Sequence, residues 1–565
     1  MRLPVGIANF KTLIKGNYLF VDKSLFIKDV MDDGAGVILI IRSRRFGKTL
    51  NLSMLDYFLK QNHYKDDENE NLFANLNISK EIEFCTQHQG QYPVIFITFK
   101  DVKYSNFTDA YGKIVLLMSE LYEKHRYLLE GNILSESEKT VFKALLDQKA
   151  DLLNTTTALK KLSEYVARKF HKPIILLIDE YDTPMHEAYM GNFYQEMMQL
   201  MRSILGEALK DNSAISKGVL TGITRIAQES LFSGLNNISI YTLLKEKYGQ
   251  YFGFTEEEVL KLITESKKEV SMSSVTEWYN GYQVGKYTLY NPWSIIKCLD
   301  SNGQLDFYWI NTSSNALIGK LLGNAKSTVK QQFEELLQGN TIEQSISENL
   351  VFLDIEVREE ALWSLLLYAG YLKVLSTELR GYEFFARMAI PNKEVGSVYY
   401  QIVTGWFSAA ISMDSYHRFI QSLADGQIDK FKEYLEAYIL QTGSYFDFNS
   451  NTAEDVFHAF ILGLVVGLRE YYIIQSNRES GLGRFDVIFI PKDKYKQKKG
   501  ILLEFKTSAT ADLLLDKAQE ALEQIKNKKY IETFEQHHVA SVSAIGLAFC
   551  GKQMELVYEN INILK

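Results

Sequence analysis

The sequence has few cysteines and few prolines. The three cysteines, Cys85, Cys298 and Cys550, lie far apart in 565 residues and form no metal-ligand or redox spacing. We expect them to be buried, reduced thiols. The seven prolines are scattered, and no Gly/Ser-rich linker or internal repeat separates the parts of the chain. Domain boundaries must therefore be inferred from the character of the segments themselves.

Long apolar runs and an excess of positive charge are also missing. The most apolar segments, 362–372 and 461–468, fall far short of the roughly 20 residues that a membrane span needs. Segment 1–16 lacks the continuous apolar stretch of a signal peptide. We therefore expect a cytoplasmic protein without membrane contact. The net charge of −8 excludes a global basic field, so nucleic-acid binding would have to come from local patches.

What the chain does have is a globular composition and enough length for several cores. Hydrophobic residues make up 46% of the sequence and aromatic residues 13%, which argues against disorder. A chain of 565 residues predicts three or four domains. From the character of the segments we place the domains at residues 1–235, 236–330, 331–450 and 451–565.

The first of these segments predicts an α/β domain. Short β-rich apolar runs alternate with longer amphipathic stretches, and the runs are VILII (37–41), VIFITF (94–99), IILLI (174–178) and GVLTGI (218–223). Near-continuous apolar runs separated by helices are typical of a parallel sheet that helices cover on both faces. The next two segments look mainly helical, as a lid-like extension (236–330) and a middle region (331–450).

The last segment predicts a second, smaller α/β domain. A helix is followed by strand-like runs at 471–476, 484–490 and 500–508, and then by a long helix at about 512–529. A last strand, AIGLAF (544–549), closes the chain in this interpretation. The predicted fold class is therefore a multidomain α/β protein with a mainly helical middle region.

A loop with the character of a phosphate-binding loop follows the first strand. VILII runs into RSRRFGKT (42–49), which ends in Gly47, Lys48 and Thr49 before a helical pattern. In such a loop, backbone N–H groups and the helix N-terminus surround the phosphates of ATP, the lysine reaches the β- and γ-phosphates, and the threonine ligates Mg²⁺. The full pattern has a glycine at position 42, where an arginine stands. The charge of three arginines could compensate for that glycine: Arg42, Arg44 and Arg45.

An acidic pair ends a later strand. IILLI (174–178) runs directly into Asp179 and Glu180. In P-loop ATPases a carboxylate in this place holds Mg²⁺, and a second residue polarises the attacking water. Asp179 and Glu180 suit these roles by their order, and Asp182 could support them or cap the following helix. A basic turn alone would be of no consequence, but the loop and the acidic pair together predict binding of ATP and Mg²⁺.

Thr224 and Arg225 follow the run GVLTGI. A polar residue at the tip of a neighbouring strand could contact the γ-phosphate or the attacking water, and Arg225 could neutralise developing charge. The alternative is that Arg225 pairs with an acidic surface residue.

Three charged residues on two strands predict a metal site in the last segment. Asp486 lies in one strand-like run, and Glu504 and Lys506 lie in the next, two residues apart and therefore on one face. If the lysine-rich segment 492–499 is a turn, the strands pair and Asp486 approaches Glu504. Two carboxylates make a site for Mg²⁺, or for Mn²⁺, and the lysine would activate water and stabilise charge during phosphodiester hydrolysis.

Two further residues fit the same site. Glu454 could supply a third carboxylate, and Gln524 could face the scissile phosphate. The alternative is that Glu504 and Lys506 form a surface ion pair of little energetic value. Charged residues in an otherwise apolar strand are costly unless they are used, which favours the functional interpretation. The lysines of 492–499 could contact a phosphate backbone, although a solvated turn is the simpler interpretation.

With these residues identified, the N-terminal half resembles the bacterial and archaeal AAA-ATPase-like family, whose members tend to lack the first loop glycine. The resemblance spans about residues 1–320 and implies a P-loop NTPase fold. It is carried by LPVGI (3–7), LFVDKS (19–24), RSRRFGKT (42–49), LLIDEYDTP (176–184), LTGITRIA (220–227), WYNGY (278–282) and YNPWS (290–294).

The C-terminal part is similar to the PD-(D/E)XK nuclease domain that commonly follows this ATPase. The matching blocks are GLGRFD (481–486), LLEFK (502–506) and ALEQI (521–525), with Glu454 ahead of them. The resemblance implies a restriction-endonuclease-like fold. It also implies a catalytic set of Asp486, Glu504 and Lys506, supported by Glu454 and Gln524.

Two functions remain open from the sequence. The first is an ATP-driven enzyme that processes nucleic acid, in defence or repair, and the intact Asp–Glu–Lys set favours it. The second is a nucleotide-controlled switch or scaffold whose C-terminal fold binds nucleic acid or protein without cutting, and the acidic net charge favours that one. We favour the first. A kinase finds less support because no catalytic-loop motif is present. The sequence leaves oligomerisation open.

Overall fold

The computed structural model describes most of the chain, and the chain forms two compact units. The first unit comprises residues 1–311 and 343–395, and the second comprises 312–342 and 396–565. The boundaries of the four predicted domains remain predictions. The described residues are 2–61, 72–224, 237–309, 314–323, 325–348, 354–355, 358–408, 412–442, 463–478, 485–495, 497–508, 510–527, 530–550 and 553–563.

A five-stranded parallel sheet forms the centre of the first unit. In spatial order the strands are β2 (Val94–Thr98), β3 (Ile174–Asp179), β4 (Ile215–Gly222), β1 (Val37–Ile41) and β5 (Ile238–Tyr241). The first four strands coincide with the four predicted apolar runs, whereas β5 was not predicted. The register pairs Thr98 with Asp179 and Ile41 with Gly222. The carboxyl ends of these strands therefore meet at one edge, which is where α/β sheets bind ligands.

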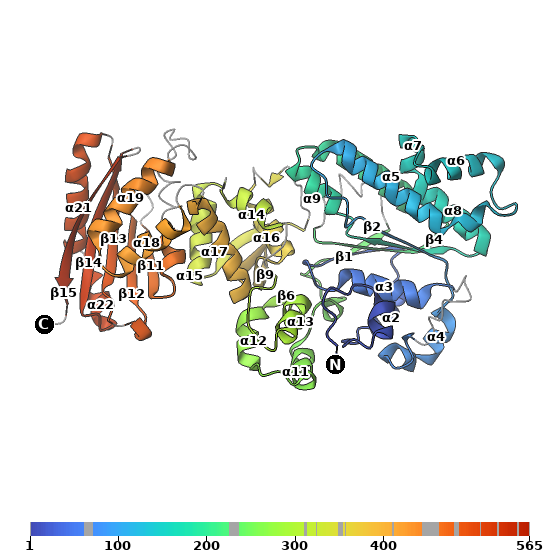
Figure 1. Ribbon diagram of the computed structural model, residues 1–565, viewed down its shortest axis with the longest axis horizontal. Coiled ribbons are helices and arrows are strands. Elements are labelled where there is room, and N and C mark those ends of the chain that lie inside the picture. The colour runs from blue at the N-terminus through green and yellow to red at the C-terminus, as the bar shows by residue number, and fades with distance from the viewer. Residues whose placement is uncertain are drawn as a thin grey trace. The chain divides into compact units, whose positions relative to one another are not determined.

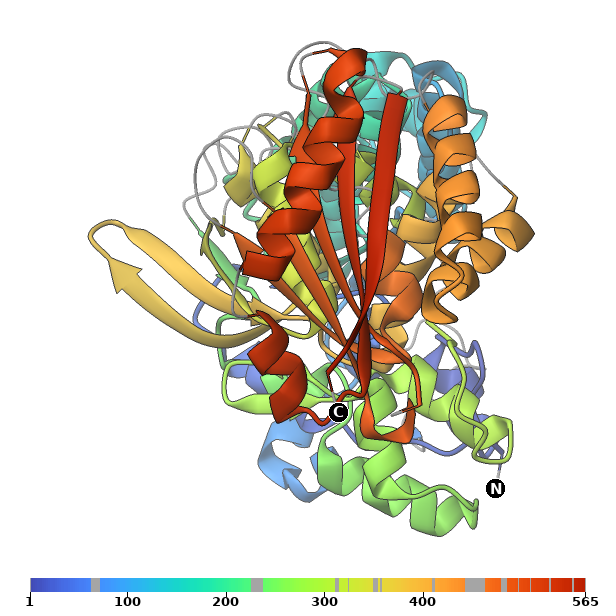
Figure 2. The same cartoon turned by 90° about the vertical axis from the view of Figure 1, so that its left-hand side faces the viewer.

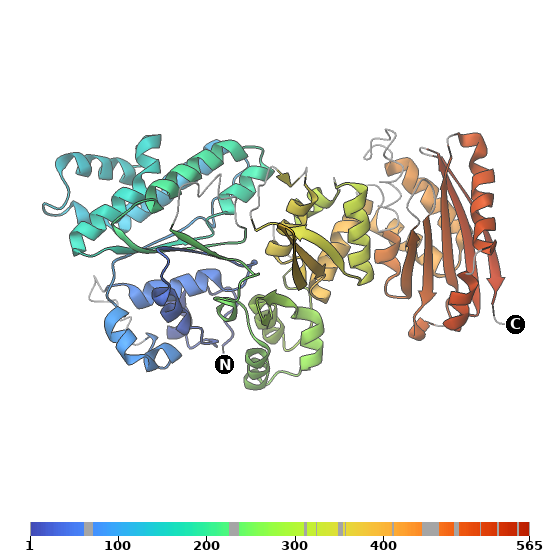
Figure 3. The same cartoon turned by 180° about the vertical axis from the view of Figure 1, so that it is seen from behind.

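Helices cover both faces of this sheet, as the apolar runs predicted. Figure 1 shows α5 and α8 on one face and α2, α3 and α4 on the other, and the view from behind in Figure 3 agrees. Because both faces are covered, β1 and β3 are buried along their whole length and show no polar alternation. The bounds are α1 (Phe10–Lys15), α2 (Leu25–Asp32), α3 (Lys48–Leu59), α4 (Ile82–His88), α5 (Phe107–Lys124), α6 (Glu136–Leu146), α7 (Leu152–Thr156), α8 (Ala158–Phe170), α9 (Thr183–Met190) and α10 (Tyr194–Leu209).

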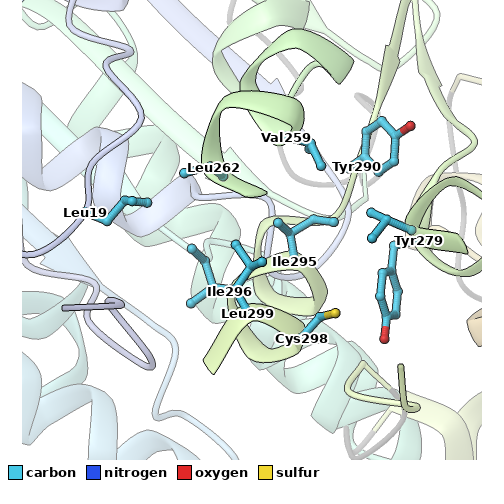
Figure 4. Close-up of a cluster of buried hydrophobic side chains, with 10 residues drawn as sticks. Leu19, Val259, Leu262, Tyr279, Tyr290, Ile295, Ile296, Cys298 and Leu299 are labelled. Atoms are coloured by element: carbon cyan, nitrogen blue, oxygen red, sulfur yellow. The ribbon is translucent and has the colours of Figure 1, made fainter. Parts of the chain in front are cut away.

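A small helical module follows the sheet in the same unit. It comprises α11 (Glu256–Ser266), α12 (Met272–Tyr279) and α13 (Pro292–Asp300), with a short hairpin of β6 (Tyr282–Val284) and β7 (Tyr287–Leu289). Its core also takes in Leu19 from the N-terminal segment, which packs with Leu262 and Ile296 (Figure 4). The first residues of the chain are therefore built into the helical module.

The middle of the chain contains a second sheet that the sequence did not predict. It consists of β8 (Ile342–Ile346), β10 (Glu383–Ala389) and β9 (Lys373–Arg380), in that order. Along the chain, α16 (Glu359–Ala369) lies between β8 and β9, and α17 (Lys393–Ser408) follows β10. β9 and β10 form the long hairpin visible in Figure 2. Leu379 and Phe384 are cross-strand partners near its tip, and both are exposed.

The second unit has helices before a mixed sheet. The helices are α14 (Ser314–Gly323), α15 (Ser327–Gln338), α18 (Met413–Ala424) and α19 (Ile428–Thr442). The sheet runs in the order β11 (Tyr472–Arg478), β12 (Phe485–Pro491), β13 (Gly500–Thr507), β14 (Ser541–Cys550) and β15 (Gln553–Asn562). Only the β13–β14 pairing is parallel among these strands.

The helices of the second unit cover both faces of this sheet. α21 (Leu514–Asn527) packs on one face, and α18 and α19 lie on the other (Figure 2), while α22 (Tyr530–Gln536) precedes β14. The prediction that AIGLAF is the last strand is wrong, because β15 follows it. β15 is half polar, and most of its polar side chains are exposed, so the apolar pattern that would mark it as a strand is weak.

Candidate functional sites

The phosphate loop connects the end of β1 to the start of α3. Gly47 has a left-handed backbone, with φ +81°, and directly precedes Lys48, the first residue of α3. A side chain would strain the backbone in this conformation, so Gly47 lets the loop turn sharply into the helix. The unbonded N–H groups of the first turn of α3 therefore stand at the end of the loop, where they favour anionic groups.

Lys48 is a buried cation at this turn, with 3% of its surface exposed. Its Nζ donates hydrogen bonds to the carbonyl oxygens of Arg42 at 3.0 Å and of Ser43 at 3.1 Å. It also lies 3.4 Å from Oε1 of Glu180, which has a φ of +52° directly after β3. The structure thus brings Lys48 and Glu180 together, and loop carbonyls hold the ammonium group where a phosphate oxygen could replace them.

Asp179 is fully buried at the end of β3 and accepts three hydroxyl hydrogen bonds. Thr49 Oγ1 donates to Oδ2 at 2.8 Å, Thr98 Oγ1 donates to Oδ2 at 3.1 Å, and Thr221 Oγ1 donates to Oδ1 at 2.9 Å. Burial, and then the neighbouring charge of Glu180, raise the pKa of Asp179 above its ordinary value. A divalent cation beside Thr49 and Asp179 would stabilise this carboxylate as an anion.

Arg42 points away from the phosphate site. Its buried guanidinium donates to the carbonyl oxygens of Ile41 at 2.7 Å and of Tyr241 at 2.9 Å, and its carbon lies 5.5 Å from the ring centroid of Phe252. Burial lowers the pKa of Arg42 to about 9. The prediction that its charge compensates for the missing glycine is therefore wrong, because the side chain bonds the backbone at the ends of β1 and β5.

The other two arginines of the loop are more accessible. Arg44 is half-buried, and its carbonyl oxygen accepts a hydrogen bond from Asn291 Nδ2 at 3.5 Å. Arg45 is exposed and has a left-handed backbone, with φ +65°. Its guanidinium carbon lies 3.8 Å from the ring centroid of Trp293, the second residue of α13. Arg45 therefore joins the loop to the helical module by a cation–π contact.

Thr224 is fully buried and bound to Asp182. The Asp182 Oδ2 atom accepts hydrogen bonds from the backbone N–H groups of Ile223 at 2.8 Å and of Thr224 at 2.7 Å, and from Thr224 Oγ1 at 2.9 Å. His186 Nε2 lies 3.3 Å from the same oxygen. Asp182 therefore holds the end of β4 and does not cap α9 with its side chain. Arg225 lies outside the described residues.

A cavity of about 290 Å³ opens beside the phosphate loop. Lys48, Thr49 and Glu180 line one part of it, and the rest is lined by the N-terminal segment, by further residues of the phosphate loop including Arg45, by residues 251–254 and by α13. The apolar lining residues include Pro4, Ile7, Leu13, Leu19, Val21, Phe254, Trp293 and Ile296. The cavity lies at the carboxyl edge of the parallel sheet, because Thr49 and Glu180 flank the end of β3.

The second unit brings together most of the residues predicted for a metal site. β12 and β13 pair antiparallel, as predicted, and the register sets position 486 directly opposite Glu504. Glu504 is fully buried, and the Lys506 side chain is 11% exposed. Phe505, between them, packs with its ring 6.2 Å from that of Phe549 on β14. The Asp486 side chain and Glu454 lie outside the described part of the chain.

α21 supplies two polar side chains to this cluster. Gln524, in the amide orientation that suits both neighbours, donates to Oε1 of Glu504 at 2.5 Å and accepts from Nζ of Lys506 at 3.0 Å. Glu520, one turn earlier on the same helix face, forms an ion pair with Lys506 and accepts from Lys517 Nζ at 2.7 Å. These two hydrogen bonds lower the pKa of Glu520 to about 2. Gln524 thus lies at the cluster as predicted.

Family comparisons match both halves of the chain. Residues 4–232 match the AAA-ATPase-like family, described as predicted AAA-ATPases, and residues 452–559 match the PD-(D/E)XK nuclease superfamily. Both family resemblances are confirmed over these residues. The AAA-ATPase-like domain therefore contains the phosphate loop and the acidic pair, and the PD-(D/E)XK domain contains Glu504, Lys506 and Gln524.

A similar curated protein comes from Azotobacter chroococcum mcd 1 and is named "Uncharacterized protein in vnfD 5'region". It is 25% identical over 401 residues, which are 70% of this chain and 68% of that protein. The alignment with this relative is longer than either family match, but the relative's name states no activity. Among the helices that the structure describes, none is long and apolar enough to cross a bilayer.

Sequence reasoning missed three polar residues at these sites. Thr98 and Thr221, in the AAA-ATPase-like domain, each stand near the carboxyl end of an apolar strand beside β3. A polar residue at the carboxyl end of an apolar strand indicates a ligand-binding edge once the strand order is known. Glu520, in the PD-(D/E)XK domain, is four residues before Gln524 on α21, and that helical spacing was its signal.

The described part of the PD-(D/E)XK domain does not by itself complete a carboxylate-rich metal site. Within it, as in the rest of the described chain, no group of three or more His, Cys, Asp or Glu residues is placed to hold a metal ion. In the turn between β12 and β13, Lys498 pairs with Asp425 at 3.1 Å, and Lys499 donates to Asn560 at 3.1 Å. These two lysines have partners within the second unit, which favours the interpretation of 492–499 as a structural turn.

Proposed function

We propose that this protein binds and hydrolyses ATP in its AAA-ATPase-like domain and cleaves phosphodiester bonds of nucleic acid, with Mg²⁺, in its PD-(D/E)XK domain. The observation that carries the first activity is the convergence of Lys48, Glu180, Thr49 and Asp179 at one end of the cavity of about 290 Å³. The hydrogen bonds of Gln524 to both buried Glu504 and Lys506 support the second.

The donor set of the AAA-ATPase-like domain fits a magnesium ion. Thr49 Oγ1 and Asp179 Oδ2 are 2.8 Å apart, and both are hard oxygen ligands of the kind that Mg²⁺ prefers. They would hold the ion, which supplies positive charge against the phosphate oxygens. Thr98 and Thr221 orient the Asp179 carboxylate, so it needs little reorganisation.

Lys48 would act on the phosphate oxygens, and Glu180 would act on the attacking water. The Lys48 ammonium would exchange its bonds with the loop carbonyls for bonds with phosphate oxygens and so neutralise the charge that develops on them. Glu180 lines the same cavity and would orient the attacking water and accept its proton. Release of Lys48 to a phosphate would loosen its 3.4 Å contact with Glu180 and free that carboxylate for water.

In the PD-(D/E)XK domain, Glu504 and Asp486 would hold the divalent ion, which lowers the pKa of a bound water. Lys506 would hold the attacking water and stabilise charge on the phosphate, and Gln524 fixes the directions of Glu504 and Lys506. The two carboxylates suit a divalent ion by their chemistry, and the register places position 486 opposite Glu504.

A second candidate function is a nucleotide-controlled switch or scaffold that binds nucleic acid or protein without cutting. The ion pair between Lys506 and Glu520 favours it, because a lysine neutralised by a neighbouring carboxylate contributes less charge to a phosphate. The net charge of −8 points the same way. In this function ATP would drive assembly, and cleavage would be missing with any metal.

Cleavage and ATPase assays on wild type and three variants separate these functions. Wild type, Lys48→Ala and Lys506→Ala are incubated with DNA and RNA, with and without ATP, in Mg²⁺ or Mn²⁺, and Lys261→Ala serves as a surface-lysine control. We expect Lys48→Ala to lose ATP turnover and Lys506→Ala to lose cleavage, with both proteins folded. Full ATP turnover in Lys48→Ala contradicts the phosphate-loop assignment, and wild type that assembles with ATP but never cleaves supports the switch.

A further inference from the structure

The hairpin of β9 and β10 leaves one long strand edge open. The spatial order β8–β10–β9 makes β9 an edge strand of its sheet, and the two strands of the hairpin lie side by side at the left of Figure 2. From residue 375 to residue 380 the side chains of β9 are all exposed, and no proline interrupts them. An exposed edge strand without proline is a template on which another strand can pair.

The turn of the hairpin determines which backbone groups face this edge. Gly381 is the first residue of a two-residue turn and alone in that turn has a positive φ, of +62°, as in a type II′ turn. A hydrogen bond closes such a turn, so Arg380 and Glu383 form a hydrogen-bonded pair. Bonded and non-bonded pairs then alternate along the two strands. The N–H and carbonyl groups of Thr377 and Leu379 therefore face away from β10.

The side chains along this edge form an apolar strip. Leu375 and Leu379 are 51% and 59% exposed, Phe384 opposite Leu379 is 53% exposed, and Tyr382 at the turn is fully exposed. These four side chains hold roughly 500 Å² of accessible surface, since a large side chain has about 200 Å² when it is fully exposed. A specific interface buries about 1,000 Å² or more in total, half of it from each partner. The strip is therefore large enough for a dimer of two copies.

The other face of the hairpin already has its charges paired. Arg380, one position along from Leu379 and so on the opposite face, forms ion pairs with Glu378 and with Glu343 of β8. An arginine between two carboxylates contributes little attraction to a phosphate backbone, which argues against nucleic acid as the partner of this edge. The partner must instead match the strip by apolar contact and by backbone pairing.

We propose that β9 pairs antiparallel with β9 of a second copy of this chain, about a two-fold axis at Thr377. In this register the outward N–H and carbonyl groups of Thr377 meet those of Thr377 in the copy. Leu379 then lies opposite Leu375 of the copy, and Leu375 lies opposite Leu379 of the copy. A shift of one residue would turn the bonding groups away from each other and set Leu375 against Glu378. The strand is thus complementary to itself, as a two-fold interface requires.

The test measures self-association of the full-length protein by sedimentation between about 1 µM and about 100 µM. Leu379→Glu puts a charge into the apolar strip, and Thr377→Pro removes an N–H that faces the open edge but keeps the bonds to β10. Leu260→Glu is the matched control, because Leu260 is 53% exposed on α11, away from the hairpin. We expect wild type and Leu260→Glu to dimerise in this range, and the two hairpin variants to raise the dissociation constant about tenfold or more.

Cysteine substitutions test the register itself. At the two-fold axis, residue 377 lies opposite the same residue of the copy at a Cα distance of about 5.5 Å, which is within the range of a disulfide. Residue 376 lies on a diagonal from its counterpart, beyond about 7 Å. Thr377→Cys should therefore form a covalent dimer under mild oxidation at least about threefold faster than Ser376→Cys. Wild type, with its three native cysteines, gives the background.

Each other result has a distinct meaning. Wild type that stays monomeric throughout overturns the proposal, and so does a dimer that Leu379→Glu and Thr377→Pro leave unchanged. Monomeric wild type whose affinity for DNA falls in Leu379→Glu assigns the hairpin to nucleic acid instead. Equal oxidation rates of Thr377→Cys and Ser376→Cys overturn the register. Thermal unfolding of each variant, compared with that of Leu260→Glu, shows whether it is folded, and Leu379→Glu with the cysteine variants decides the case if Thr377→Pro is not.

Discussion

At the residue scale, the buried polar groups around the end of β3 fall into two sets. Lys48 and Glu180 line the cavity, and Asp179 accepts a hydrogen bond from Thr49 at its margin. Asp182 instead accepts hydrogen bonds from the residues that directly follow β4, and Arg42 donates to carbonyl groups at the ends of β1 and β5. The first set is available for chemistry, whereas the second holds the strand ends that position it.

Asp182→Asn tests the second set. Burial alone would raise the pKa of Asp182, but hydrogen bonds from His186 and from the backbone N–H groups of Thr224 and Ile223 outweigh it and lower that pKa to about 2. An amide turned toward these donors loses acceptor bonds, so we expect the first unit to lose about 1–3 kcal/mol of unfolding free energy at pH 7. Denaturant unfolding followed by circular dichroism measures this loss.

The pH dependence of that loss has a defined sign. A carboxylate with a lowered pKa stabilises the folded state above its unfolded pKa of 3.8, and this contribution disappears as the pH falls toward 2. The stability difference between wild type and Asp182→Asn should therefore stay constant near neutral pH and shrink between about pH 4 and pH 2. A difference that grows on acidification would show that Asp182 is not held as an anion.

Glu520→Gln tests whether the ion pair with Lys506 restrains the PD-(D/E)XK site. The Glu520 side chain is 47% exposed, so its pairing energy is screened and small. If the site cuts nucleic acid, we expect the amide to free Lys506 for phosphate and to raise the cleavage rate by at most about fivefold. Initial cleavage rates at fixed Mg²⁺ measure the effect, and Lys517→Ala, which leaves the Lys506 pair in place, is the control. A cleavage rate lost in Glu520→Gln would make Glu520 a required group.

The residues that meet at the sites could be predicted from the sequence, but the directions in which their side chains point could not. The order of Lys48, Thr49, Asp179 and Glu180 along two strand ends was enough to place them together, because parallel strands end at one edge. The inward turn of Arg42 depends on the carbonyl groups of Tyr241 and Lys247, about 200 positions away in the chain. No local pattern encodes such a partner.

At the scale of helices and strands, the buried strands could be predicted from the sequence and the exposed strands could not. The four runs that became β1 to β4 are apolar throughout because helices cover both faces, so periodicity identifies them. β9 is exposed along most of its length, and β15 for much of it, so their sequences carry little apolar signal. Strand order also escaped prediction, since β5 joins the sheet next to β1 rather than next to β4.

The packing of α21 on β14 is the element-scale feature that places Gln524. A side-chain carbon at Gly546 on β14 would lie 2.2 Å from the carbonyl oxygen of Ala518 on α21, a distance that neither backbone allows. Gly546→Ala should therefore push α21 away from the sheet, destabilise the second unit by about 1–3 kcal/mol and reduce any cleavage. Thermal unfolding and the cleavage assay measure these effects.

Gly112→Ala is the matched control for that substitution. Gly112 lies in α5 of the other unit, and an added side-chain carbon there would meet nothing within 4 Å. Alanine at an open helical position stabilises a helix by about 0.5–1 kcal/mol relative to glycine. Gly546→Ala that unfolds no earlier than Gly112→Ala would contradict the close packing of α21 and β14.

At the scale of the whole molecule, one chain carries an ATPase-type domain and a nuclease-type domain, each with its own core and its own cluster of charged groups. The sequence contained enough signal for both domains because each has a motif fixed to a strand end. It did not show that segment 343–395 belongs to the unit that contains the phosphate loop. That assignment depends on long-range contacts, such as the hydrogen bond from Ser43 to Tyr368.

The central claim is that the cluster around Lys48 and Glu180 hydrolyses ATP, and Glu180→Gln tests it most directly. The amide keeps the size of the side chain but cannot accept a proton from water, while Lys48, Thr49 and Asp179 remain. In paired measurements of ATP affinity and turnover, we expect Glu180→Gln to bind Mg-ATP within about threefold of wild type and to turn it over about 100-fold or more slowly. Turnover at the wild-type rate in Glu180→Gln would contradict the account.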